Sequence, residues 1–318
     1  MPEIRHPAVD KDALADWCER WLGAPPAAEL FESGYLSTVK GLRLADGREV
    51  VVKVRPGEPR QAGCAEVHRA LRAAGFPCPE PLVDLQPLGG HVASAEVLVP
   101  DAGQAPPRSE LARLSAAGLA RLVELAPDPR SVPSLAPSPS WTAWDHAEPG
   151  LWPRPEEADV DLNAHLEPRW LDRVAAAVRE HLRGYRADPV IGHGDWHPDN
   201  LCWQGPQLTA VHDWDSVICQ PEAAIAGMGA VSFLGIDKPD VLAGVEDSSA
   251  FIEAYQHAQG RRWTPEDHAA SWAAGLWQRA FDAKVRPLGG DPEQGLARDE
   301  AAARLRLAGL DPGLAADA

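Results

Sequence analysis

The first hundred residues combine helical and strand-like patterns of apolar positions. Asp10 can cap a helix whose apolar positions fall on one face, namely Leu14, Trp17, Cys18, Trp21 and Leu22. Two β-rich stretches flank Ala45-Asp46-Gly47, which is a strong signal for a β-hairpin. A helix is expected over residues 62–74, ending at Gly75, and further strands follow, one of them over 91–99. This part of the chain therefore predicts a small sheet with helices beside it.

The pattern becomes helical after a Pro- and Gly-containing stretch at residues 101–107. Ser109 can cap a helix with Leu111, Leu114, Leu122 and Leu125 on one stripe. Residues 126–140 are rich in Pro and Ser and predict a loop. Further helices are expected near residues 168–185, 223–233, 250–258, 265–285 and 301–307, and short β-like segments at 201–203 and 208–212. The prediction is an α+β chain with a β-rich N-terminal lobe (residues 1–100), a hinge (101–107) and a larger α-helical C-terminal lobe (108–318).

Composition and charge narrow the class of protein. The 318 residues are 45% hydrophobic and 24% charged, which is the usual globular mix. There are 47 acidic and 30 basic residues, and the net charge of −17 disfavours nucleic acids and anionic membranes as partners. No apolar run is long enough to cross a bilayer, and the N-terminus does not resemble a signal peptide. The five scattered cysteines form no C-x-x-C, so we expect neither disulfides nor a zinc site, and a cytoplasmic location.

Two short segments carry the chemistry. Residues 193–200 read HGDWHPDN, and VHDWD follows at 211–215. The Asp-x-x-x-x-Asn spacing, followed by a strand that ends in Asp, is typical of a phosphoryl-transfer site. Asp195 is the candidate catalytic residue that orients and deprotonates an alcohol, while Asn200 and Asp213 offer the oxygen ligands that Mg²⁺ prefers. His193 is better placed to brace the loop, and the alternative for the whole segment is a polar turn.

These segments resemble the aminoglycoside phosphotransferase and choline kinase-like family, whose two-lobed fold is related to that of protein kinases. Its catalytic loop reads H-G-D-x-H-x-x-N and its metal-binding strand I-D-W-E or a near variant. The resemblance implies a protein-kinase-like fold, with ATP and Mg²⁺ as cofactors and a small-molecule hydroxyl acceptor as partner.

The resemblance also implies a set of nucleotide-binding residues in the first hundred. It implies a phosphate-covering loop with Ser33, Gly34, Ser37 and Thr38, for which a plain hairpin turn is the alternative. Lys53, at the end of a valine run, would contact phosphate, and Glu66 would be its ion-pair partner, with Glu49 and Glu58 as competitors. Glu96, Val97 and Leu98 would form the strand that leads to the hinge beside adenine.

The chain departs from the family pattern in two places. The run after the second motif, CQPEAAI at residues 219–225, lacks an Asp where the family often has one, which puts in doubt the bracing that this Asp provides. The A-P-E signature of protein kinases is absent, so a protein substrate is disfavoured.

The acceptor site has weaker signals. Trp272 and Trp277 lie in the helical pattern at 265–285, for which core packing is the favoured interpretation. The loop tryptophans Trp141, Trp144 and Trp152, and the motif neighbours Asp199, Trp214, Asp215 and Glu222, are further candidates. The crowd of carboxylates near the motifs favours a neutral or cationic acceptor over an anionic one.

The sequence therefore predicts an ATP-dependent phosphotransferase, a kinase that acts on the hydroxyl of a small molecule such as an aminoglycoside, an amino alcohol or a sugar. The alternative is a kinase-like protein that binds nucleotide without turnover.

Overall fold

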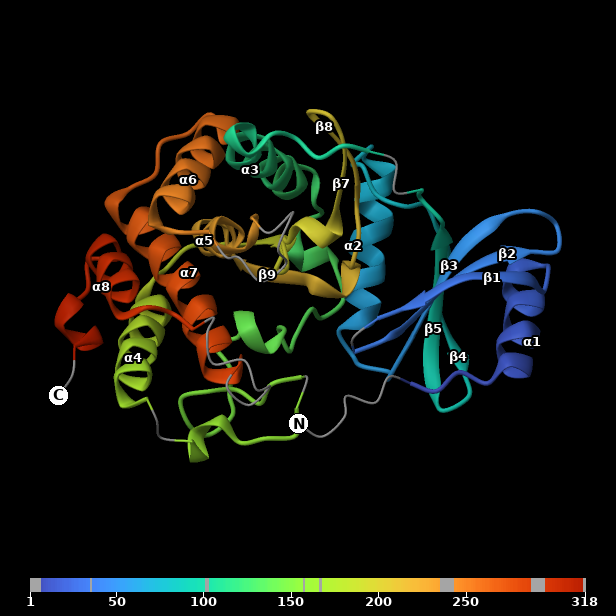
Figure 1. Ribbon diagram of the computed structural model, residues 1–318, viewed down its shortest axis with the longest axis horizontal. Helices are drawn as coiled ribbons and strands as arrows, with labels where there is room; N and C mark the ends of the chain where they lie inside the picture. The colour runs from blue at the N-terminus through green and yellow to red at the C-terminus, as the bar shows by residue number, and fades with distance from the viewer. Residues whose placement is uncertain are drawn as a thin grey trace.

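The computed structural model describes residues 7–34, 36–100, 103–156, 158–165, 168–234, 243–286 and 295–316. The N-terminal part forms a five-stranded sheet. Figure 1 shows α1 (Lys11–Leu22) on the outer side of this sheet and a larger assembly of helices on the other side of the molecule. The fold is α+β, as predicted.

The sheet is antiparallel, with the strand order β1-β2-β3-β5-β4. Its strands are β1 (Pro26–Ser33), β2 (Thr38–Leu44), β3 (Glu49–Arg55), β4 (Pro81–Leu88) and β5 (His91–Val97). The predicted hairpin joins β2 to β3, and Gly47 there has φ 90°, a conformation that favours glycine. Along β3 the side chains of Val50, Val52 and Val54 are buried in the sheet's own core, so Lys53 lies on the opposite face.

Helix α1 (Lys11–Leu22) covers that core. The Asp10 Oδ1 atom accepts a hydrogen bond from the Ala13 N–H at 2.8 Å, which confirms the predicted cap. Four of its five predicted apolar positions are buried. The prediction for Trp21 is wrong, because this side chain is 38% exposed in the last turn of the helix. The Arg20 guanidinium lies 5.0 Å from its ring, in the place where contact with the sheet was expected.

Helix α2 (Gln61–Ala73) lies between β3 and β4 in the chain, but it packs elsewhere. Cys64, Val67 and Leu71 are buried in the same core as the C-terminal helices, not in the core of the sheet. Figure 1 shows α2 between the sheet and those helices. Although the predicted boundary at residue 100 assigns α2 to the N-terminal lobe, its packing joins it to the larger one.

The C-terminal part contains the predicted helices: α3 (Arg108–Leu125), α4 (Arg169–Gly184), α5 (Glu222–Ser232), α6 (Val245–Gln259), α7 (Pro265–Val285) and α8 (Arg298–Leu307). Helices α5 and α7 cross closely, since a Cβ on Gly227 would lie 1.9 Å from the Ser271 carbonyl oxygen. The predicted cap Ser109 is wrong. Helix α3 begins at Arg108, directly after the extended Pro107, which takes the N-cap position, so Ser109 lies inside the first turn.

Two small sheets hold the motif segments. The predicted pair becomes β7 (Leu201–Gln204) and β8 (Gln207–Val211), and a second pair, β6 (Pro189–His193) and β9 (Val217–Pro221), was not predicted. Because His193 lies opposite Val217 across the second pair, the start of the first motif lies beside the end of the second.

Residues 103–107 lead from the sheet to α3, and Asp101 and Ala102 of the predicted hinge lie outside the described residues. This connection runs against β7, because the Gly205 N–H donates to the Gln104 carbonyl at 3.1 Å. Within the described ranges, no helix is both long and apolar enough to span a membrane.

Candidate active site

His193 holds the two motifs together. It is fully buried, and its Nε2 lies 3.0 Å from the His212 carbonyl oxygen and 3.1 Å from that of Asp213. Its Nδ1 accepts the Asp195 N–H at 3.2 Å, so Nε2 carries the proton and donates to the second motif. This bracing role is the one that the sequence suggested for His193.

Asp195 and Asn200 form the core of the first motif. The Asn200 Nδ2 donates to both the backbone oxygen and the Oδ2 of Asp195, at 3.0 and 2.8 Å. Because the amide nitrogen is used in this way, the Asn200 Oδ1 is the side-chain atom that could serve as a ligand. Burial, reinforced by the charge of Asp213, raises the pKa of the Asp195 carboxyl above its ordinary value. A raised pKa makes this carboxylate a better proton acceptor.

Asp213 follows β8 in a strained conformation. It has φ 58°, and no other non-glycine residue in the described part of the chain has a positive φ. The backbone is bonded back to the first motif, because the His212 N–H donates to the Asn200 carbonyl at 2.9 Å. One carboxylate oxygen of Asp213 accepts from the Ser216 hydroxyl at 2.8 Å, and the other accepts from the Lys53 ammonium. The two motifs therefore meet at Asn200 and Asp213, although 12 residues lie between them in the sequence.

Lys53 makes its ion pairs with the second motif. Its Nζ contacts Asp213 and lies 2.7 Å from the Asp215 Oδ2. Burial works to raise the pKa of the Asp213 carboxyl, but the Lys53 ammonium outweighs it and holds that pKa below the ordinary range. Burial likewise opposes the charge on Lys53, and the two carboxylates raise the pKa of Lys53 above its usual value.

Glu66 does not take the expected position beside Lys53. Its Oε2 lies 2.7 Å from the Arg69 Nη2, and its side chain is 44% exposed. The reason is helical phase: the buried face of α2 carries Cys64 and His68, so Glu66 falls on the outer side. The expected ion pair between Lys53 and Glu66 is absent from this structure.

The loop between β1 and β2 differs in part from the expected phosphate-covering loop. Gly34 has φ 124°, and a Cβ there would lie 1.9 Å from the Ser37 carbonyl oxygen, so the turn requires glycine. The Thr38 hydroxyl donates to the Pro7 carbonyl at 2.7 Å and is buried, which removes it from phosphate contact. Ser33 is exposed and Ser37 buried, and the loop residue Tyr35 lies outside the described residues.

The strand that leads to the hinge also offers less than expected. The N–H groups of Val97 and Leu98 donate to the carbonyls of Glu80 and Glu49, at 2.9 and 3.1 Å, so they are not available to adenine. The Glu96 side chain is half-buried, 3.8 Å from the His212 Nδ1. Burial opposes the imidazolium, but Cys202 and Glu96 raise the pKa of His212 to about 9. His212 is a site residue that sequence reasoning missed, because a histidine before the motif Asp is no recognised signal.

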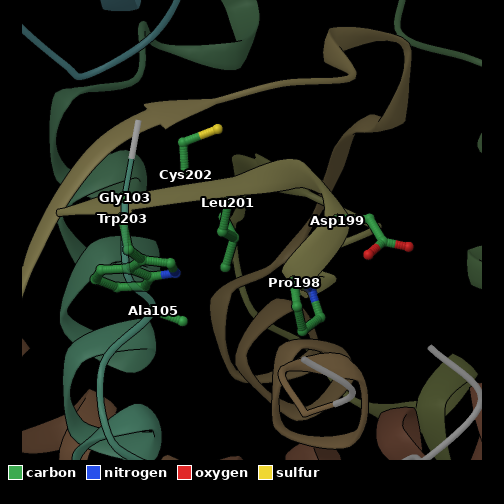
Figure 2. A pocket seen from close by; sticks show the side chains of 7 residues that line it. All are labelled: Gly103, Ala105, Pro198, Asp199, Leu201, Cys202 and Trp203. Atoms are coloured by element: carbon green, nitrogen blue, oxygen red, sulfur yellow. The ribbon is translucent and has the colours of Figure 1, made fainter. Parts of the chain in front are cut away.

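A pocket of about 120 Å³ lies where the connection to α3 passes the first motif. Figure 2 shows its lining: Gly103, Ala105, Pro198, Asp199, Leu201, Cys202 and Trp203. Cys202 also lies beside His212, which in turn faces Glu96. The first motif, β7 and the connection to α3 thus border this pocket.

Most candidate acceptor residues have structural partners instead. Trp214 stacks on His68, with ring centroids 4.8 Å apart, and Glu222 pairs with Arg261 at 2.5 Å. The tryptophans Trp144, Trp152, Trp272 and Trp277 are buried in the core, as the core-packing interpretation predicts for the last two. Trp141 is half-buried, and its Nε1 donates to the Gly194 carbonyl at 3.1 Å, so it supports the catalytic loop.

Other residues also brace the catalytic loop. The Gly194 N–H donates to the Ser216 carbonyl at 2.7 Å, and the Trp196 Nε1 donates to the Ser115 hydroxyl at 2.8 Å. Both Trp196 and Ser115 are buried, so this contact anchors the loop to α3.

With this geometry in view, the comparison with known families is decisive. The profile of the phosphotransferase enzyme family (APH) matches residues 27–265, most of the chain and both motifs. The chain belongs to this family. The resemblance seen in the motifs is confirmed, as is the predicted class of enzyme, a phosphotransferase. The chain has no match among curated protein sequences.

Solved structures show the same fold at low sequence identity. A spectinomycin phosphotransferase in complex with ADP and spectinomycin is 12% identical, with a TM-score of 0.57 over 96% of this chain and 97% of that one. An amicoumacin kinase with AMP-PNP and Ca²⁺ is 12% identical, with a TM-score of 0.61 over 92% and 89%. A macrolide 2′-phosphotransferase from Brachybacterium faecium is 19% identical, with a TM-score of 0.52 over 92% and 98%. These likenesses confirm the predicted protein-kinase-like fold.

Proposed function

We propose that this phosphotransferase moves the γ-phosphoryl group of ATP to a hydroxyl of a small molecule. The observation that carries the proposal is the joining of the two motifs. His193 bonds to the backbone of both. Asn200 contacts Asp195, and Asp213 contacts Lys53, which supports a shared site. Phosphoryl transfer requires positioning and charge stabilisation rather than covalent chemistry from the protein, and this arrangement supplies both.

Asp195 is the residue that acts on the acceptor. Its carboxylate takes the proton of the acceptor hydroxyl as that oxygen bonds to the γ-phosphorus, while the bond from the γ-phosphorus to the bridging oxygen of ADP breaks. The bond from the Asn200 amide to the Asp195 Oδ2 fixes the orientation of the carboxylate. Its raised pKa brings it closer to that of an effective base near neutral pH.

Asn200 and Asp213 are the residues that would hold Mg²⁺. The donor set fits, because an amide oxygen and a carboxylate are hard oxygen ligands, and Mg²⁺ at phosphates takes few protein ligands and keeps waters. Bound there, Mg²⁺ supplies positive charge against the phosphate oxygens. The described residues contain no group of three His, Cys, Asp or Glu side chains arranged as a complete metal cage, which suits a metal shared with a nucleotide.

The acceptor is proposed to be neutral or cationic, for example an amino-bearing or sugar-like alcohol. Asp199 supports this, because its side chain is 67% exposed at the rim of the pocket. Arginines that would attract an anion are occupied: Arg154 pairs with Asp159 at 3.3 Å, and Arg279 with Glu300 at 3.1 Å. An anionic acceptor would meet the charge of several carboxylates near the motifs, Asp195, Asp199, Asp213 and Asp215, as well as that of ATP.

The test is ADP release from ATP and Mg²⁺ over a panel of hydroxylated amines, aminoglycosides, neutral sugars, sugar phosphates and hydroxy acids. We expect acceptor-dependent ADP release with at least one amine or neutral sugar. A preference for sugar phosphates or hydroxy acids would contradict the proposed acceptor class. Binding of ADP without release for any acceptor would instead favour the alternative of a protein that binds nucleotide without turnover.

Two variants of the same loop separate chemistry from folding. Asp195→Asn removes only the proton-accepting charge, so its kcat should fall on the order of 10²–10⁴-fold while ATP binding is retained. The matched control is Asp199→Asn, which should keep a nearly normal kcat and show a higher KM for cationic acceptors. Near-normal turnover in Asp195→Asn would refute the catalytic assignment.

A further inference from the structure

The inward face of α2 offers no carboxylate to Lys53. Its buried positions are Gln61, Gly63, Cys64, Val67, His68 and Leu71, none of which is acidic. Glu66 lies on the outer face and pairs with Arg69, which in turn lies 3.1 Å from Asp84. An anchor for Lys53 must therefore come from another element.

Asp215 provides that anchor. Its Oδ2 lies 2.7 Å from the Lys53 Nζ and 2.7 Å from the Arg55 Nη1, so one oxygen joins two cations of β3. The three side chains are between 10% and 24% exposed, so water screens this contact less than it would screen a pair on the surface. Lys53 and Arg55 alternate along β3 and share the face that is turned away from the core of the sheet.

The backbone around Asp215 is fixed from the other side by α2. Arg60, at the start of α2, donates to the carbonyls of Asp215 and Val217, and the Cys64 Sγ lies 3.8 Å from the Asp215 carbonyl oxygen. The 3₁₀ turn η5 (Trp214–Ser216) packs against α2, where Trp214 stacks on His68. The Asp215 carboxylate is thus presented to β3 by a firmly held segment.

Asp213 is a poorer candidate for a permanent partner of Lys53, because it is the residue proposed to hold Mg²⁺. Asp215 has no such second task in the proposed function. We propose that Asp215 is the positioning residue for Lys53, in the place where the family resemblance led us to expect a carboxylate on α2. This inference rests on the proposed function, in which Lys53 contacts the nucleotide phosphates.

The proposed ion pair joins the sheet to the larger part of the molecule. Lys53 belongs to the sheet, whereas Asp215 lies between Trp214 and Val217, which are buried in the core that contains α2 and the C-terminal helices. An ion pair from Lys53 to a carboxylate on α2 would join the two cores, and so does the ion pair to Asp215 on η5. Only Asp215 also lies two residues from the proposed metal ligand Asp213. The positions of lysine and metal ligand are then set by one segment of the chain.

The test is a double-mutant cycle on ADP affinity, measured by calorimetry with Mg²⁺ and without acceptor. Asp215→Asn should weaken ADP binding at least about fivefold in the wild-type background and less than about twofold in a Lys53→Met background. Asp215→Glu, which keeps the charge, should recover part of the loss. The matched control is Glu66→Gln, which should bind ADP like the wild type.

The outcomes separate this inference from the proposed function. Equal losses in both backgrounds, no loss in Asp215→Asn, or a loss in Glu66→Gln as large as that in Asp215→Asn would overturn the positioning role. If Asp215→Asn does not fold, the same cycle is run with Asp215→Ser, which leaves room for water around the two cations. If the wild type binds no ADP at all, the proposed function fails and the inference with it.

Discussion

Two clusters in this molecule use the same chemistry, one carboxylate shared between two cations. In the cleft, Asp215 joins Lys53 and Arg55. Between α7 and α8, the Glu300 carboxylate lies 3.1 Å from Arg279 and 2.8 Å from Arg304. The first joins two cores, and the second lies within one.

Access to water is what distinguishes the two clusters. The Arg304 side chain is 1% exposed, and its guanidinium donates to Glu300, to the Ser248 hydroxyl and to the backbone carbonyl of Ala243 instead of to water. The two carboxylates differ little, since Glu300 is 19% and Asp215 24% exposed, but Lys53 is 21% exposed and has Asp213, which is 31% exposed, as a second partner. We conclude that the cluster around Glu300 stabilises the fold. In the other cluster, Asp215 is the lasting partner of Lys53, and Asp213 is the partner that a ligand can replace.

The largest expected effect comes from the cluster in the cleft. Asp213→Ala should lower kcat on the order of 10³-fold or more, because several kcal/mol of charge stabilisation depend on the metal it would hold. Nucleotide affinity should also become insensitive to Mg²⁺, which a titration with and without the ion measures. Circular dichroism should show an intact fold. If the Mg²⁺ dependence of nucleotide binding is unchanged, Asp213 does not hold the metal, and the functional difference between the two clusters is refuted.

The cluster around Glu300 should respond in stability instead. Glu300→Gln leaves two buried guanidinium groups without a counter-charge and should lower the free energy of unfolding by about 3 kcal/mol. Its kcat per folded molecule should stay near normal, because α8 lies outside the cleft. Glu253→Gln on the exposed side of α6 is the control and should change stability by less than about 0.5 kcal/mol. If Glu300→Gln loses activity but keeps normal stability, the cluster around Glu300 does not serve to stabilise the fold.

The same cluster predicts a pH dependence. Burial works to raise the pKa of Glu300, but Arg279 and Arg304 outweigh it and lower that pKa. A lowered folded-state pKa means that the stabilisation is complete above the unfolded value, about 4.3, and is lost as the pH falls through the folded value. The difference in urea stability between wild type and Glu300→Gln should therefore be constant near neutral pH and shrink in acid. A difference that grows in acid would contradict this sign.

The smallest effect should come from an ion pair that solvent surrounds. Arg43 and Glu49 lie 2.8 Å apart, but their side chains are 52% and 39% exposed. Arg43→Ala should change the free energy of unfolding by less than about 1 kcal/mol, and high salt should remove even that. If Arg43→Ala lowers the free energy of unfolding as much as Glu300→Gln does, exposure to solvent does not determine how much these ion pairs contribute to stability.

The elements with strong local signals could be predicted from the sequence. The hairpin at residues 45–47 and the helices from α2 to α8 follow from turn residues and apolar periodicity. The motif residues Asp195, Asn200 and Asp213 were recognisable because their spacing is specific, and the structure brings them together. Their roles in catalysis and metal binding remain predictions.

Features that depend on tertiary contacts could not be predicted. Strands β6 and β9 are five residues each and carry proline at an end, so they lack a periodic signal. The partner of Lys53 depends on which face of α2 turns inward, and Glu66 lies two residues from the buried Cys64. The bond from Thr38 to Pro7 joins the loop to a segment 31 residues away, which no local pattern reveals.

The packing of α2 decides how the chain can be divided. A fragment that ends at residue 100 would include this helix but would remove the helices against which it packs. Val67, Leu71 and Phe76 would then face water as one apolar patch, and such patches cause aggregation. The complementary fragment, from residue 101 onward, would lack the α2 residues that complete its hydrophobic core. The two halves should therefore be insoluble when expressed separately and recover structure only when produced together.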